Sequence, residues 1–148
     1  MAIIGDRNIR EVQLSTAELQ ERHALLQRVL WSRQIRRSAR IRDFLQYVCE
    51  RAVREPGVEL HEQEIGHRVF GRPPDYNTGE DNLVRVTVSQ ARKKLEQYFA
   101  SDGATEPIIL EIPKGTYLPV FRLRTDTLAA IEVAAPPDQR LVRYRRAV

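Results

Sequence analysis

The first hundred residues carry hydrophobic side chains at the spacing of amphipathic helices. After Leu14, Ser15 and Glu18 form a capping box, and a hydrophobic stripe follows it. The stripe consists of Leu19, Leu26 and Leu30. We therefore expect a helix from Ser15 to about Trp31.

Two further helices are predicted between residues 38 and 71. The first starts near Ser38 and ends before Pro56-Gly57. Its hydrophobic face consists of Ile41, Phe44, Leu45, Val48 and Ala52. The second, "HEQEIGHRVFG", ends at Gly71, and Pro73-Pro74 prevents its continuation. Residues 58–60 between these helices are compatible with a short strand, and residues 72–81 with a loop.

The segment "DNLVRVTVSQARKKLEQYF", Asp81 to Phe99, has two conflicting periodicities. Its first half alternates hydrophobic and polar residues like a half-buried strand, whereas its second half is rich in helix formers. One stripe nevertheless runs through both halves at helical spacing, and no turn-forming residue separates them. The stripe is Val84, Val88, Ala91, Leu95 and Tyr98. We interpret the segment as one helix with Asp81 as its N-cap.

A hairpin is predicted in "PIILEIPKGTYLPVF", where two strand-like runs flank "PKGT" and Gly115 supplies a positive φ. Pro119 lacks a backbone donor, so the second strand is expected at an edge or with early loss of pairing. The sequence thus predicts a mainly α fold with a small β component. Beyond Arg124 we expect a linker and a basic tail.

The positive charge is unevenly distributed over the 148 residues. The net charge is +4 and the sequence pI about 9.6, yet Arg33 to Arg42 contains five arginines and no acid. The last nine residues, "RLVRYRRAV", contain four more arginines. Such clusters favour a polyanion such as nucleic acid, but a solvated helix face fits them equally.

Several classes of protein are disfavoured by what the sequence lacks. No hydrophobic run is long enough for a membrane span or a secretory signal, and the single Cys49 excludes an internal disulfide. We expect a cytoplasmic protein with no membrane partner. The sequence lacks phosphate-binding loops, nucleophile elbows and metal-spaced Cys/His sets. We therefore expect that the protein is not an enzyme and that it binds no cofactor or metal. Glu62, Glu64 and Asp75 are read as solvated acids.

The helix predicted over 81–99 leaves six residues off its buried stripe. They are Asn82, Arg85, Val86, Ser89, Gln90 and Lys93. Val86 can be an ordinary exposed valine, because isolated surface hydrophobic residues are common. It can also belong to a recognition helix, in which Gln90 pairs with adenine, a hydrophobic side chain touches a thymine methyl, and Arg85 or Lys93 contacts guanine or phosphate. We favour the recognition helix.

The order of elements resembles the winged-helix effector domain of the OmpR/PhoB-type response regulators. "EIGHRVFG" resembles their positioning helix, "LVRVTVSQARKKLE" their recognition helix, and "EIPKGTYLPVF" their wing. The resemblance covers Ser38 to Arg122 and carries no receiver domain. It divides the chain into an N-terminal arm and helix (1–37), a winged helix-turn-helix domain (38–123), and a linker with a basic tail (124–148).

The resemblance also implies a set of DNA contacts. Base-reading positions fall near Val86, Thr87 and Gln90, and phosphate contacts near Asn82, Ser89, Arg92 and Lys93. Wing contacts fall near Lys114, Thr116 and Tyr117. Loop 72–81 corresponds to the segment that some relatives present to RNA polymerase.

We therefore expect a sequence-specific double-stranded DNA-binding protein that acts as a bacterial transcriptional regulator. Helix 81–99 would enter the major groove while the hairpin wing contacts the backbone or minor groove. Further phosphate anchors are Arg85, Lys93, Lys94 and, in the arginine cluster, Arg36, Arg37 and Arg40. Few base contacts per domain favour a homodimer or a tandem oligomer on DNA. The alternative is a winged-helix adaptor that binds acidic protein surfaces.

Overall fold

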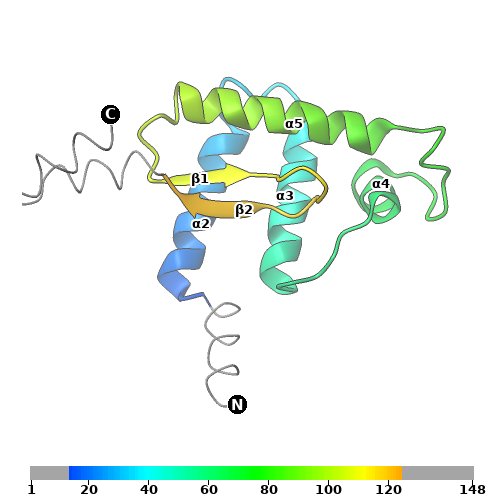
Figure 1. Ribbon diagram of the computed structural model, residues 1–148, viewed down its shortest axis with the longest axis horizontal. Helices are drawn as coiled ribbons and strands as arrows, with labels where there is room; N and C mark the ends of the chain where they lie inside the picture. The colour runs from blue at the N-terminus through cyan, green and yellow to red at the C-terminus, as the bar shows by residue number, and fades with distance from the viewer. Residues whose placement is uncertain (1–13, 125–148) are drawn as a thin grey trace, which may run out of the picture.

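The computed structural model describes residues 14–124 of the chain. Within them, four helices precede a two-stranded antiparallel sheet, and α5 crosses the whole molecule above the hairpin (Figure 1). The elements are α2 (Thr16–Leu30), α3 (Ala39–Arg54), α4 (Glu62–Phe70), α5 (Leu83–Ala100), β1 (Ile108–Glu111) and β2 (Val120–Leu123). The mainly helical class with a small sheet is therefore confirmed.

The start of α2, the start of α3 and the end of α4 lie where local sequence signals place them. The Ser15 hydroxyl accepts from the Glu18 amide, and the Glu18 carboxylate accepts from the Ser15 amide, which confirms the capping box of α2. Ser38 caps α3 through the Ile41 amide. Gly71 ends α4 in the left-handed conformation, with φ of 72°.

The ambiguous segment is a single helix, α5. All five residues of its predicted stripe are buried, with exposed fractions between 0% and 5%. The predicted N-cap is one residue too early, because Asn82 occupies that position. Asp81 still stabilises the first turn, since its Oδ1 accepts from the Leu83 amide at 3.1 Å.

The hairpin pairs Ile108 with Leu123 and Glu111 with Val120. Gly115 lies in the turn between the strands with φ of 86°, as predicted, and β2 begins directly after Pro119. Residues 58–60 form no strand, so that expectation was wrong. Among residues 14–124, the paired strands are β1 and β2 alone.

One hydrophobic core connects all the elements. Phe44, Leu45 and Val48 of α3 are fully buried, and they share a cluster with Ile65 of α4 and Leu110 of β1. The hydrophobic side of α2 enters the same cluster through Leu25, Leu26, Val29 and Leu30. Ala52, expected in the core, is only half-buried near the end of α3. Helix α2 therefore packs into the same hydrophobic core as α3, α4, α5 and the hairpin.

Candidate nucleic-acid interface

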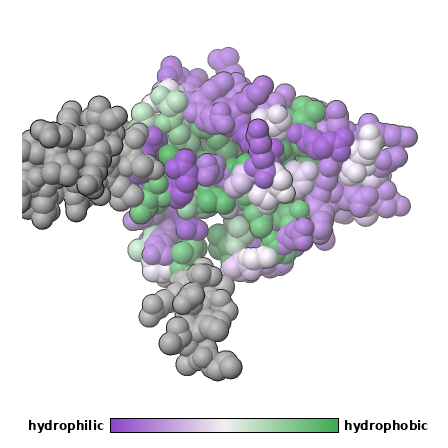
Figure 2. Space-filling view, in the orientation of Figure 1, coloured by the Kyte–Doolittle hydropathy of each residue, from purple (hydrophilic) through white to green (hydrophobic). Residues whose placement is uncertain are grey.

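The outer face of α5 combines exposed polar side chains with one exposed valine. All six residues expected off the buried stripe, from Asn82 to Lys93, are exposed. Val86 keeps 41% of its surface exposed among polar neighbours. The surface over α5 is mainly hydrophilic in Figure 2, while hydrophobic residues gather around the hairpin below it. This face can offer hydrogen-bond donors, acceptors and one methyl-bearing contact to a partner.

Thr87 does not belong to this face. It is only 1% exposed, so the prediction that it reads a base was wrong. Thr87 is three residues after Val84 and four before Ala91, which places it on the buried side of the helix. The helical period therefore indicates a buried Thr87, whereas the family resemblance implied a base contact at this position.

Arg92, expected to contact phosphate, has a structural role in the fold. Its Nε donates to the carbonyl of Ile112 at 2.9 Å, and its Nη2 donates to the carbonyls of Pro113 and Thr116 at 3.0 and 3.1 Å. Arg92 therefore satisfies three backbone acceptors in the hairpin turn. These bonds engage Nε and Nη2, and Nη1 of Arg92 forms no hydrogen bond with another residue of 14–124. The side chain fixes the hairpin turn against α5.

The hairpin turn presents one of its three predicted contact residues freely. Lys114 is exposed at the tip, whereas Thr116 and Tyr117 are half-buried. The Thr116 hydroxyl accepts from the Leu118 amide at 3.1 Å, which shapes the turn. On α5, Lys93 is exposed and Lys94 is half-buried. Of the three lysines on α5 and the hairpin turn, Lys93 and Lys114 are therefore the exposed ones.

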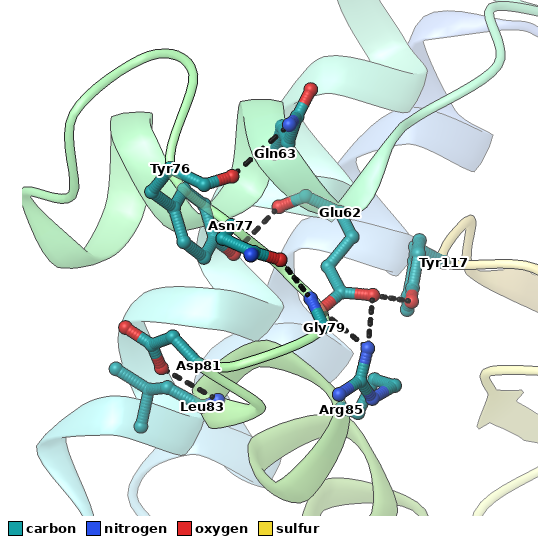
Figure 3. Close-up of polar contacts among 9 residues, drawn as sticks. All are labelled: Glu62, Gln63, Tyr76, Asn77, Gly79, Asp81, Leu83, Arg85 and Tyr117. Atoms are coloured by element: carbon teal, nitrogen blue, oxygen red, sulfur yellow. Dashed lines mark hydrogen bonds and ion pairs between the residues drawn. The ribbon is translucent and has the colours of Figure 1, made fainter.

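A half-buried acid, Glu62 at the start of α4, contacts both α5 and the hairpin turn. Both carboxylate oxygens of Glu62 accept from Nη1 of Arg85, at 3.1 and 3.2 Å, and the Tyr117 hydroxyl donates to the same carboxylate at 3.4 Å (Figure 3). Glu62 is 15% exposed and Arg85 46%. Burial, and then the Glu62 carboxylate, raises the pKa of the Tyr117 phenol, which therefore stays protonated.

The reading of Glu62 and Glu64 as solvated acids was wrong. Glu64 accepts from the Tyr47 hydroxyl at 2.7 Å and pairs with Arg51. The positions of these acids in the first turn of α4 were visible in the sequence. Their partners were not, because Arg51 and Arg85 lie on other helices.

Loop 72–81 is held in place at both ends and in its middle. Arg72 and Asp81 form an ion pair at 2.6 Å, and the Leu83 amide, then Arg72, lowers the pKa of Asp81. Tyr76 packs under the loop at 9% exposure, and its carbonyl accepts from Gln63 (Figure 3). The loop therefore presents its exposed residues in a defined arrangement.

The arginine cluster divides into paired and unpaired members. Arg33 pairs with Asp102 at 2.7 Å, beyond the end of α5, and Arg42 stacks on the exposed Trp31 ring at 4.9 Å. Arg36, Arg37 and Arg40 are exposed and form no ion pair with another residue of 14–124. The four arginines of the C-terminal tail lie outside the described residues.

Metal binding and catalysis by cysteine have little support in the described part of the chain. No group of three or more His, Cys, Asp or Glu side chains there is arranged to hold a metal ion. Burial raises the pKa of the Cys49 thiol to about 12, which makes it a poor nucleophile at neutral pH. Residues 14–124 contain no helix that is both long and apolar enough to cross a membrane.

The sequence matches no protein-family model, and no curated protein or solved structure matches it either.

Proposed function

We propose that the protein binds double-stranded DNA with sequence preference as a winged helix-turn-helix. In this proposal α4 and α5 are the helix pair, and β1 with β2 is the wing. The observation that carries it is the outer face of α5. There Val86 is 41% exposed, and the polar residues Asn82, Ser89 and Gln90 are exposed beside it.

The dimensions and chemistry of α5 support insertion into the major groove. A groove about 12 Å wide admits one helix, and its base pairs present acceptors, donors and thymine methyl groups. Gln90 matches the edge of adenine, and Val86 matches a thymine methyl. Arg92 fixes the hairpin turn beside this helix, so that Lys114 is positioned to meet the neighbouring backbone.

The remaining exposed polar residues supply contacts that carry no sequence information. Asn82, Ser89 and Lys93 lie at the flanks of the reading face, and Arg36, Arg37 and Arg40 add positive charge near the start of α3. A single winged helix contacts few base pairs. We therefore propose a dimer or tandem array on repeated half-sites, acting in transcriptional regulation, with loop 72–81 facing RNA polymerase.

Selection of bound duplexes from a random pool tests this function directly. We expect a recurring motif, and Gln90→Ala should relax the preference at one base pair by about 1–3 kcal/mol. Lys93→Ala is the matched control on the same face. It should weaken cognate and random duplexes equally and reduce the salt slope by about one unit.

Two results would contradict the proposal. One is the lack of any duplex binding at low salt, where electrostatic attraction is strongest. The other is a selected pool without a recurring motif, which leaves only non-specific binding. Identical behaviour of the Gln90 and Lys93 variants would remove the base-reading role of Gln90 alone.

A hydrophobic groove favours a second candidate, the protein-binding adaptor. It has a volume of about 1010 Å³ and lies between α2, the end of α3 and β2. Leu19, Leu26, Val53, Pro119 and Phe121 are among its lining residues. Hydrophobic hollows of this kind often bind partners. Duplex titrations at two salt concentrations separate the candidates, since an adaptor would bind no DNA in either.

A further inference from the structure

Arg85 is the one cation on the reading face of α5 that is paired with a half-buried acid. Its Nη1 donates to both oxygens of Glu62, which is 15% exposed at the start of α4. The Tyr117 hydroxyl approaches the same carboxylate from the hairpin turn (Figure 3). Helix pair and hairpin turn therefore meet at a single carboxylate, with Arg85 as its solvent-facing partner.

This pairing makes Arg85 a poor phosphate anchor. A phosphate contact depends on net positive charge and on the release of counterions. The Glu62 carboxylate, about 3 Å away, offsets that charge. Lys93, which forms no ion pair within residues 14–124, is better suited to phosphate. Arg85 can still donate directional hydrogen bonds, although its positive charge is offset.

The geometry leaves one edge of the guanidinium available. Nε and Nη2 of Arg85 form no hydrogen bond with any residue of the described chain, and 46% of the side chain is exposed. Two parallel N–H groups on that edge match O6 and N7 of guanine, the commonest bidentate contact in the major groove. Because Glu62 holds Nη1, the fork is oriented before DNA arrives.

We propose that Arg85 reads a guanine through its Nε–Nη2 edge and that Glu62 is the positioning residue that aims it. This inference rests on the proposed DNA-binding function and adds a base identity to it. The target site of the protein contains a G·C pair next to the positions that Val86 and Gln90 contact.

The test uses the duplex selected by the full-length wild-type chain and a set in which each G·C pair is replaced in turn. Arg85→Lys keeps the charge but lacks the fork, so its preference for one guanine should fall roughly 5- to 150-fold. Glu62→Gln should weaken the same preference. It should also tighten binding to random duplexes and steepen the salt slope, because Arg85 becomes a full cation.

Glu80→Gln is the matched control, since Glu80 is exposed in the neighbouring loop and forms no ion pair within residues 14–124. It removes the same charge and should leave the base preference unchanged. Thermal melts establish that each variant is folded. Arg85 is a surface position, so Arg85→Lys decides the guanine contact even if Glu62→Gln lowers stability.

The outcomes separate the two proposals. A wild-type chain that binds no duplex overturns the proposed function and this inference together. A chain that binds selectively, but whose guanine preference survives Arg85→Lys, overturns the inference alone. Loss of preference in Arg85→Lys but not in Glu62→Gln removes the positioning role of Glu62 and leaves the guanine contact in place.

Discussion

At the scale of single residues, Gly66 decides how loop 72–81 attaches to α4. The Tyr76 ring occupies the space where a side chain at position 66 would begin. A Cβ there would lie 2.3 Å from the Tyr76 hydroxyl and 2.4 Å from its ring. Tyr76 also donates to the Glu62 carbonyl at 3.3 Å. Glycine is therefore required by close packing, although its φ is ordinary for a helix.

We predict that Gly66→Ala destabilises the protein by about 1–3 kcal/mol through overpacking. Urea unfolding followed by circular dichroism measures the change. In an unhindered helix the same substitution would stabilise by up to about 1 kcal/mol, so the sign of the effect is decisive. Gly79→Ala is the control, because its Cβ would meet only the exposed Asn77 side chain, at 3.1 Å. A gain of stability in Gly66→Ala would refute the packing argument.

At the scale of elements, one carboxylate joins α2 to the end of α5. Glu106 accepts from Nε and Nη2 of Arg28, both at 2.8 Å, and from the Tyr98 hydroxyl at 2.9 Å. Its side chain is 12% exposed. The hydrogen bonds from Arg28, more than those from Tyr98, hold the pKa of Glu106 below its ordinary value of 4.5. The ionised acid is therefore favoured in the folded protein.

This lowered pKa predicts a dependence of stability on pH. Because Glu106 binds its proton more weakly when folded, its contribution is complete above the unfolded pKa of 4.5 and is lost as the pH falls through the folded value. Glu106→Gln should cost about 1–3 kcal/mol at neutral pH and flatten the decline below about pH 4.5. Thermal melts between pH 7 and 3 measure both effects. An unchanged acid slope in the variant would show that Glu106 contributes nothing to it.

At the scale of the whole molecule, α2 belongs to the core even though the resemblance places it outside the winged-helix domain. Leu25 and Val29 are 1% and 0% exposed, and they share a cluster with Phe44 of α3 and Val88 of α5. Arg28 of α2 also reaches Glu106 after α5. The stable unit therefore includes residues from α2 to β2.

We predict that Leu25→Ala lowers the free energy of unfolding by about 2–5 kcal/mol, as expected for a fully packed core leucine. The fluorescence of Trp31 and circular dichroism should report one transition with the same midpoint. Val53→Ala, at a site 53% exposed, should have little effect. A small effect of Leu25→Ala would show that α2 is an appendage rather than part of the core.

The sequence by itself determined the positions of the helices, the hairpin and the exposed face of α5. Caps, glycine turns and the 3.6-residue period act between neighbours in the chain, so they can be read locally. The same period placed Val86 outward and, against the resemblance, Thr87 inward.

Only the tertiary structure decided which charged side chains form hydrogen bonds or ion pairs within the fold. Arg92 satisfies carbonyls at least 20 residues away, and Glu62 meets Arg85 from 23 residues away. No local pattern encodes these pairs, because they depend on how helices and hairpin pack together. That packing assigned Arg92 to the hairpin turn, α2 to the core and Glu62 to Arg85. The packing therefore distinguishes the side chains that are exposed to a binding partner from those that stabilise the fold.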